Sequence, residues 1–425
     1  MIGLFLLLAC LGRPALGQSG LPRPVVPMTE ELLGRKPRNA LYGSLEGAIE
    51  TMRAYRPLDL TAAAWKQANP GRSHEEWARQ ARKFLRHGLH YDLPPVDLQA
   101  RTLERVETDT FIREKIEFNT TPWFRVPGYF YIPKNVPLPA PALVVFHEWG
   151  GPMLFGAERV CGEPVHPAIV EHRAKCTSGR PLADWYASQG YAVIVIDAYH
   201  FGHRAPRGIG GLPSSYDPSA LDVTTLAKYN ALAGEALYLG VRQLNWAGTT
   251  WAGVNYGDDS RCIDYLLSRK EVDPDRIGCT GLSGGGWRTN IMAALEPRIK
   301  AAVAVGWMTT GDAQQAYNVS GAIGTFCLLP GVWNRIDIPD LIAMAAPKAV
   351  MVVSATEDTL FPPLGQREAA KQIAGAYAWA GQAQRFRDYA PAKPHCYDAE
   401  IQAEALAWFN THLKNARAPA SEKSN

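Results

Sequence analysis

The chain has 425 residues, and 47% of them are hydrophobic, which is enough for the core of a large α/β domain with an appendage. Its 44 basic and 41 acidic residues leave a formal net charge of +3, and the basic residues form no run or stripe. This near balance excludes nucleic acid as an expected partner.

The first 17 residues are predicted to be a secretory signal peptide. Residues 2–12 are apolar and too few to span a bilayer as a helix, and Ala15-Leu16-Gly17 supplies a cleavage site of small residues. The run Leu7-Leu8-Ala9-Cys10 also resembles a bacterial lipoprotein box, which would tether the protein by Cys10. Either interpretation predicts an exported protein, periplasmic or secreted, with a lipid anchor at Cys10 as its one route to a membrane. A buried N-terminal strand is the alternative.

Residues 18–105 are predicted to form an N-terminal helical extension, and residues 106–417 the main domain, followed by a polar tail at 418–425. The extension shows short helical stretches between proline-rich joints, at 29–33, 45–55 and 75–85. The last stretch carries a stripe of apolar residues, so we expect it to pack on the main domain.

From residue 106 onward the pattern indicates an α/β domain. Residues 110–119 and 123–132 alternate with period two and predict an antiparallel pair of strands. Helix-length segments then separate a series of buried apolar runs, which predicts a mostly parallel sheet with helices on both faces. The runs are 143–146, 192–196, 277–280, 301–305 and 349–353, with a short strand at 385–389 before a final helix at 399–413. Between the second and third runs, residues 205–219 and a helix at 226–246 are expected to form part of a cleft wall.

One strand of this sheet is expected to end at a nucleophilic serine. The sequence Gly281-Leu282-Ser283-Gly284-Gly285 fits Gly-x-Ser-x-Gly, and a strand before it and a helical stretch after it give the context that this motif needs. Glycine two residues before and after the serine lets the strand and helix pass closely, so the hydroxyl of Ser283 is pushed into a cleft. The Gly284 N–H is then aimed at any negative charge that develops beside it.

A serine nucleophile needs a base and an acid, which follow it along the chain in folds of this kind. Asp358 lies after the strand at 349–353 and is the expected acid, with Glu357 as the alternative. His395 lies on the loop before the last helix and is the expected base. His412, the one other histidine after Ser283, lies within the predicted final helix.

The second half of an oxyanion hole is expected in the loop after the strand at 143–146. Its sequence is His147-Glu148-Trp149-Gly150-Gly151, and the glycines let backbone approach a substrate. We predict that the N–H groups of Trp149 and Gly284 bind the oxyanion. A plain strand-to-helix turn is the alternative for this loop.

Together these segments resemble one branch of the α/β-hydrolases, the dienelactone hydrolase and acetyl xylan esterase-like family. The resemblance rests on 272–286, Val126–Pro133, Ile196–Arg204 and Glu357–Pro362, and it extends over residues 75–415. It implies the α/β-hydrolase fold, a Ser283, Asp358 and His395 triad and hydrolysis of carboxylic esters. Dienelactone hydrolases use a cysteine where this chain has Ser283. The loop at 147–149 resembles their Gln-Glu-Ile turn, so Glu148 is a candidate carboxylate that supports the site, or a structural one.

The chain is thus predicted to be an exported serine esterase that needs no cofactor and no metal, with a small-molecule or carbohydrate ester as substrate. The resemblance favours acetyl esters of carbohydrates. A general carboxylesterase or peptidase is one alternative, and a binding protein that kept the fold but lost the chemistry is another. Trp287, Trp307 and Trp333 are either residues of the core or surfaces on which sugars stack.

The cysteines and histidines outside the predicted triad offer further, weaker expectations. Six cysteines follow the predicted signal peptide, and Cys161 and Cys176 flank a loop and are the candidates for a disulfide. The same two cysteines with His166 and His172, or His200 with His203, could be written as zinc ligands, although their spacing matches no known zinc module.

Overall fold

The structure is a computed structural model, and it describes residues 59–162, 165–317 and 323–415. The predicted signal peptide, Cys10, the helices predicted at 29–33 and 45–55, and the polar tail all lie outside the described residues.

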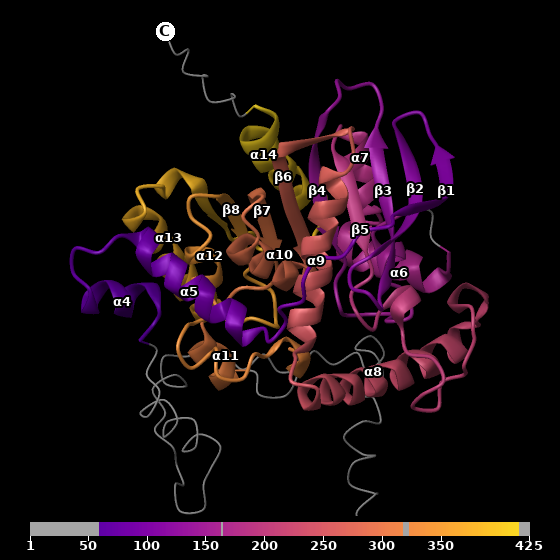
Figure 1. Cartoon of the computed structure of the whole chain (residues 1–425), viewed down its shortest axis with the longest axis horizontal. Coiled ribbons are helices and arrows are strands. Elements are labelled where there is room, and N and C mark those ends of the chain that lie inside the picture. Colours follow the sequence, from indigo (N-terminus) through magenta and orange to yellow (C-terminus); the bar gives the residue numbers. More distant parts are fainter. Residues whose placement is uncertain (1–58, 163–164, 318–322, 416–425) are drawn as a thin grey trace, which may run out of the picture.

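A nine-stranded sheet runs through the centre of the molecule in the order β1-β2-β3-β5-β4-β6-β7-β8-β9 (Figure 1). The first three strands and β5 pair in antiparallel fashion, whereas β5, β4, β6, β7, β8 and β9 are parallel neighbours. This confirms the predicted mostly parallel sheet. The strands are β1 (Arg101–Glu107), β2 (Phe111–Asn119), β3 (Arg125–Pro133), β4 (Ala140–Phe146), β5 (Ala192–Ile196), β6 (Val272–Leu282), β7 (Ile299–Val305), β8 (Ala349–Val353) and β9 (Phe386–Tyr389).

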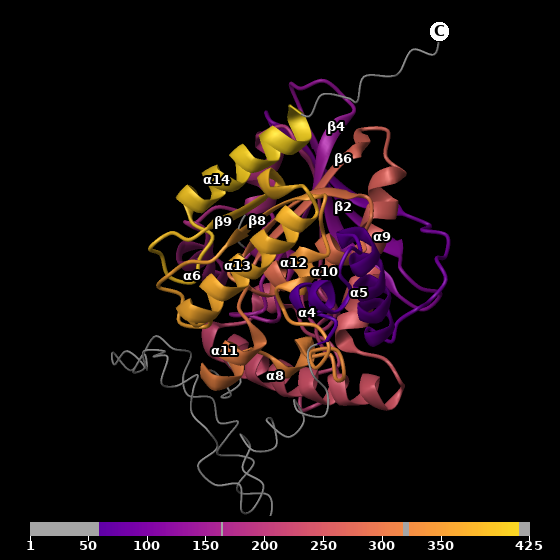
Figure 2. The same cartoon turned by 90° about the vertical axis from the view of Figure 1, so that its left-hand side faces the viewer.

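The parallel strands are buried on both faces, because successive side chains of a strand point to opposite sides. In β4, Val144 packs in one core and its neighbour Val145 in the other. Figure 2 shows α14 on one side of the sheet and α9 on the other. The first core is covered by α9 (Trp251–Leu267), α10 (Gly284–Leu295), α12 (Asp340–Ala343) and α13 (Pro363–Trp379), and the second by α7 (Leu182–Ser188) and α14 (Ala399–Phe409).

The described part of the N-terminal extension contains two helices, α4 (Ala62–Ala68) and α5 (His74–Gly88). The side chain of Ser73 caps α5 and the side chain of Glu76 returns a bond to the Ser73 backbone, which fixes where the helix begins. The carboxylate of Asp340 accepts the Ala62 N–H at 2.9 Å, and it thereby holds α4 against α12. The helix predicted at 75–85 is confirmed, and it packs on the main domain as expected.

Strand β1 was not predicted, and it crosses the proposed boundary at residue 105. Its side chains are almost all exposed, so it lacks the apolar alternation by which a half-buried strand is recognised. It adds to the sheet through pairing with β2 alone.

The insertion between β5 and α9 contains the long helix α8 (Val223–Trp246), whose first turn is capped by Asp222. Figures 1 and 2 both place α8 and α11 (Gly311–Tyr317) beyond the carboxyl end of the parallel strands. The insertion is therefore at the edge where β6 ends. In the part of the chain that the structure describes, no helix has the length and apolar character needed to cross a membrane.

Candidate active site

Ser283 occupies a sharp turn between β6 and α10. Its backbone has φ of +56° and ψ of −117°, a conformation that costs a non-glycine residue about 1–3 kcal/mol. The strain is sustained by the surrounding backbone, since the Ser283 N–H donates to the carbonyl of Val305 at 2.8 Å and its carbonyl accepts from Trp287 at 2.9 Å. This is the geometry that lifts a serine hydroxyl above the sheet edge.

The two flanking glycines are required by close backbone contacts. A β-carbon built on Gly281 would lie 2.6 Å from the carbonyl oxygen of Phe146, and one built on Gly285 would lie 2.4 Å from the same oxygen. Neither position can accept a side chain without moving β4. The spacing of the glycines around Ser283 thus follows from the approach of α10 to β4 and β6.

Asp358 and His395 meet at the same sheet edge, although 37 residues separate them. Nδ1 of His395 lies 2.6 Å from Oδ2 of Asp358, whose other oxygen accepts the N–H of Leu360 at 2.8 Å. The Asp358 side chain is fully buried, whereas that of His395 is 23% exposed. A buried carboxylate bonded to Nδ1 orients the imidazole and leaves Nε2 for a substrate or nucleophile.

The loops that carry these two residues are joined by backbone hydrogen bonds. Thr356 donates to the carbonyl of Pro391 at 2.9 Å, and Glu357 donates to that of Lys393 at 3.1 Å. The side chain of Glu357 is exposed, so the structure pairs His395 with Asp358 and not with the alternative carboxylate.

His395 and Ser283 each contact the end of β7. The Ser283 N–H binds the carbonyl of Val305, the last residue of β7, and the next residue is Gly306. A β-carbon built on Gly306 would lie 3.0 Å from Cε1 of His395. The imidazole therefore packs on the residue beside the serine turn. Gly306 went unnoticed in the sequence because nothing in its local pattern shows which side chain lies over it.

The predicted oxyanion residues also adjoin each other. A β-carbon built on Gly284 would lie 2.1 Å from Cδ2 of the Trp149 ring, so the indole rests on the first residue of α10. The Gly284 N–H belongs to the first turn of a helix, where N–H groups have no partner within the helix. Trp149 is half-buried, and its ring contacts the rings of Trp251, Trp287 and Phe326 with centroids 4.9–5.3 Å apart.

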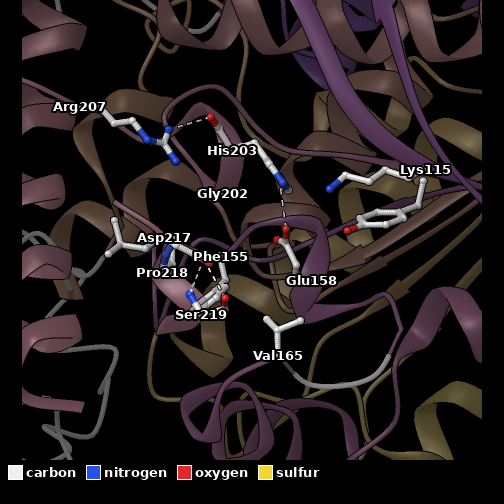
Figure 3. A pocket seen from close by; sticks show the side chains of 12 residues that line it. Lys115, Phe155, Glu158, Val165, Gly202, His203, Arg207, Asp217, Pro218 and Ser219 are labelled. Atoms are coloured by element: carbon white, nitrogen blue, oxygen red, sulfur yellow. Dashed lines mark hydrogen bonds and ion pairs between the residues drawn. The ribbon is translucent and has the colours of Figure 1, made fainter. Parts of the chain in front are cut away.

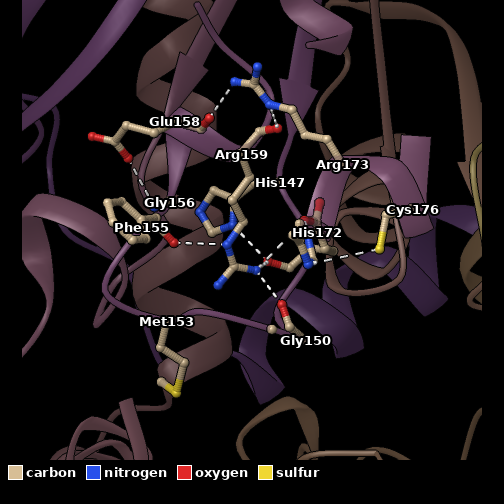
Figure 4. A network of polar contacts seen from close by, with 12 residues as sticks. His147, Gly150, Met153, Phe155, Gly156, Glu158, Arg159, His172, Arg173 and Cys176 are labelled. Carbon is tan, nitrogen blue, oxygen red and sulfur yellow. Dashed lines mark hydrogen bonds and ion pairs between the residues drawn. The ribbon is translucent and has the colours of Figure 1, made fainter. Parts of the chain in front are cut away.

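Glu148 is a buried residue of this loop and lies among charged groups. Figure 4 shows two of its neighbours, Arg159 and His172. Its carboxylate makes a short contact with Nε2 of His172 and lies 3.7 Å from the guanidinium of Arg159. Burial alone would raise the pKa of Glu148, but His172 and Arg159 outweigh it and hold the pKa at about 2. Glu148 is therefore ionised, and its contacts with His172 and Arg159 hold the loop in place.

Arg159 ties the same loop through backbone oxygens. Its guanidinium donates to the carbonyls of Glu148 at 2.7 Å, Gly150 at 2.5 Å and Phe155 at 2.8 Å. The carbonyls of Glu148 and Gly150 lie on either side of Trp149, so Arg159 fixes the path of the backbone there. The roles of Arg159 and His172 were missed in the sequence, because neither residue belongs to a motif.

His147 joins this loop to the end of β5. Its Nε2 accepts the N–H of Ala198 at 3.0 Å, and its Nδ1 lies 2.8 Å from the carbonyl of Glu148. Full burial, and then the charges of Arg288 and Arg159, lower the pKa of His147 to about 3. The ring is thus neutral, with Nδ1 as donor and Nε2 as acceptor, and its role is structural.

The structure separates the alternatives left open for the cysteines, the candidate zinc ligands and the tryptophans. Cys161 and Cys176 are both free, as are the other four described cysteines. Neither set of zinc ligands comes together in the described residues: His166 instead caps α6 (Pro167–Thr177), and His200 packs on α8. Trp287 and Trp307 are buried in the core, and Trp333 is partly buried against it.

The fold and the strained serine turn define an α/β-hydrolase. The chain belongs to the Abhydrolase family, whose family model Abhydrolase_7 matches residues 39–390. It is 24% identical to "putative hydrolase YtaP" of Bacillus subtilis (strain 168) over 325 residues, which cover 76% of this chain and 95% of that protein.

Solved structures show the same fold at low sequence identity. A crystal structure described as "a putative acetyl xylan esterase", from Bacteroides fragilis NCTC 9343, matches with a TM-score of 0.60 and 18% identity, covering 85% of each chain. A glucuronoyl esterase from Solibacter usitatus matches with a TM-score of 0.55 and 14% identity, covering 82% of this chain and 93% of that one. This chain and these two structures therefore share the arrangement of the sheet and helices.

Proposed function

We propose that this protein is an exported serine hydrolase that cleaves carboxylic esters through an acyl-enzyme, with acetyl or similar esters on carbohydrates as substrates. The observation that carries the proposal is the 2.6 Å contact between Nδ1 of His395 and Oδ2 of Asp358, at the sheet edge where Ser283 sits in its strained turn. An imidazole that a carboxylate orients, at the same sheet edge as a serine with positive φ, is typical of nucleophilic catalysis.

In the proposed mechanism, Nε2 of His395 takes the proton of Ser283 as Oγ attacks the ester carbonyl carbon. Asp358 holds the imidazole and stabilises the imidazolium. The N–H groups of Gly284 and Trp149 bind the oxyanion of the tetrahedral intermediate, which collapses as His395 protonates the leaving alcohol. Water then attacks the acyl-enzyme, again with His395 as base, and frees the acid. Every step uses side chains and backbone N–H groups of this chain together with one water molecule.

The printed names of the similar structures support the choice of substrate. One is described as "a putative acetyl xylan esterase" and another as a glucuronoyl esterase, and both names refer to esters of carbohydrates. Export is supported by the apolar, signal-like residues 2–12, and the mature N-terminus of protein recovered from the periplasm or medium tests it.

A fluorophosphonate probe tests the nucleophile. We expect peptide mapping to find one adduct, on Ser283. The Ser283→Ala variant should lose the labelling. The control variant Ser188→Ala should keep it, because Ser188 is a surface residue whose hydroxyl donates to the carbonyl of Trp185. Acetylated xylan, p-nitrophenyl esters of rising chain length and a glucuronate methyl ester then separate the substrate classes. A folded protein with neither adduct nor hydrolysis of p-nitrophenyl acetate would show that it is a binding protein.

A further inference from the structure

Two carboxylates and an imidazole converge behind the loop that carries Trp149. Asp197 follows β5, Glu158 belongs to the short helix η1 (Ala157–Arg159), and His203 belongs to η2 (Gly202–Arg204). Nδ1 of His203 lies 3.2 Å from Oδ2 of Asp197 and 3.2 Å from Oε1 of Glu158. The three ligand atoms all lie within 4.8 Å of one another. In the part of the chain that the structure describes, no other group of three such residues does so.

These separations suit a shared metal ion. In tetrahedral geometry, bonds of about 2.0–2.2 Å from Zn²⁺ to histidine nitrogen and carboxylate oxygen place adjacent ligand atoms about 3.3–3.6 Å apart. The two distances from His203, both 3.2 Å, lie just below this interval. The third distance, between the carboxylate oxygens of Glu158 and Asp197, is within 4.8 Å, and any adjustment that an ion needs would fall on Glu158.

Asp197 is rigidly held, and one of its oxygens remains directed at the cluster. Oδ1 accepts the N–H of Ala157 at 2.6 Å, whereas Oδ2 accepts the backbone N–H of His203 at 2.9 Å and faces its ring. Glycines at 156 and 202 pack on the carboxylate so closely that a β-carbon on either would lie 2.1–2.6 Å from it. A ligand fixed in this way loses little conformational freedom when it binds an ion.

The charge of the cluster also favours a cation. The Asp197 side chain is 2% exposed and that of Glu158 is 13% exposed, so two acids share a site with little solvent. Like charges held this close require a counter-charge, which His203 supplies when protonated and a divalent ion would supply in greater measure.

A cavity of about 230 Å³ opens beside the cluster (Figure 3). Glu158 and His203 lie on its wall, and the His203 side chain is 40% exposed. The cavity gives an ion a path to the site and leaves room for the waters that would complete its coordination. Lys115 also lines the cavity, and its ammonium group opposes the binding of a cation there.

We propose that Glu158, Asp197 and His203 form a binding site for a divalent transition-metal ion of the Zn²⁺ class, with His203 coordinating through Nδ1. One nitrogen and two carboxylate oxygens suit Zn²⁺ better than Ca²⁺ or Mg²⁺, which prefer oxygen ligands alone. Glu158 precedes Arg159, whose guanidinium holds the loop of Trp149, so the ion would brace that loop. Its role is structural, and the chemistry at Ser283 does not use it.

Titration of the chelator-treated full chain with Zn²⁺ in a calorimeter tests the site. We expect one ion per chain. His203→Gln and Glu158→Gln should each weaken binding at least 30-fold, whereas His87→Gln, an exposed histidine on α5, should not change it. Co²⁺ should give a visible absorption spectrum that His203→Gln abolishes, and Ca²⁺ should not compete.

Lys115→Met separates a cation site from an anion site. Loss of the ammonium group should tighten Zn²⁺ binding several-fold, and saturating Zn²⁺ should raise the Tm of wild type but not of His203→Gln. Absence of Zn²⁺ binding below 100 µM at pH 7.5, to a folded chain, would show that a protonated His203 merely bridges the two acids. Binding that survives both His203→Gln and Glu158→Gln would place the ion elsewhere, and either result overturns the proposal.

Discussion

The indole ring of Trp149 rests on the backbone of Gly284, and a β-carbon at Gly284 would lie 2.1 Å from Cδ2 of the ring. Trp149 follows β4, and Gly284 begins α10 directly after Ser283. This contact makes neighbours of the two residues whose N–H groups we assign to the oxyanion hole. The fit depends on the absence of a side chain at Gly284.

Replacing Gly284 with alanine is therefore expected to displace Trp149 and to remove one of the two proposed donors. Loss of one oxyanion donor lowers kcat by roughly 10²–10³-fold, and we expect a loss of that size with p-nitrophenyl acetate. The matched control is Gly375→Ala, an exposed site in α13 where a β-carbon meets nothing within 4 Å. It should keep full activity and gain about 0.5–1 kcal/mol in free energy of unfolding. Undiminished activity in Gly284→Ala would exclude Gly284 from the oxyanion hole.

Asp358→Asn tests the orientation of the base. The amide would no longer hold the Nδ1–H of His395 as a carboxylate does, so the imidazole would present the wrong tautomer to Ser283, and we expect kcat to fall about 10⁴-fold. Initial rates with p-nitrophenyl acetate at pH 7–9 measure this. Glu357→Gln changes the neighbouring carboxylate, which is exposed, and should alter the rate less than about twofold. A larger loss in Glu357→Gln than in Asp358→Asn would reverse the assignment.

Glu148 should make the stability of the protein depend on pH in acid. Its pKa of about 2 in the folded state is below the ordinary value of 4.5. Its contribution to the free energy of unfolding is therefore complete above pH 4.5 and is lost as the pH falls toward 2. Glu148→Gln breaks a buried ion pair, and we expect it to cost about 3 kcal/mol at pH 7 and progressively less below pH 4.5.

Urea unfolding at pH 7 and at pH 3 measures the effect of Glu148→Gln. The control is Glu171→Gln, an exposed acid paired with Lys175 one helical turn away, which should cost no more than about 0.5 kcal/mol at either pH. Equal costs for Glu148→Gln at both pH values would show that the ionisation of Glu148 contributes nothing.

All six described thiols should be free and slow to react. Five of them are buried, and burial raises the pKa of Cys176, the half-buried one, to about 12. Protein that begins after residue 17 and has not been reduced should thus react very slowly with Ellman's reagent at pH 8. In denaturant it should react with six equivalents of the reagent per chain. Four equivalents would reveal a disulfide, with Cys161–Cys176 the first pair to examine by peptide mapping.

Local patterns in the sequence determined the main features of this protein. Apolar runs separated by helix-length segments predicted the parallel sheet, because strands buried on both faces need no polar alternation. The glycines around Ser283 predicted the turn, since the steric demands of that turn are local. The order of Asp358 and His395 after the serine predicted which residues would share the sheet edge, and the structure places those two side chains in contact.

Tertiary packing alone decided what surrounds these residues. Arg159 and His172 hold Glu148 from 11 and 24 residues away, and no spacing rule links them to it. Strand β1 is recognised through its pairing with β2, and the meeting of Glu158, Asp197 and His203 depends on three loops. Sequence patterns report which face of an element is buried, whereas contacts between loops depend on how the complete sheet and its helices bring distant segments together.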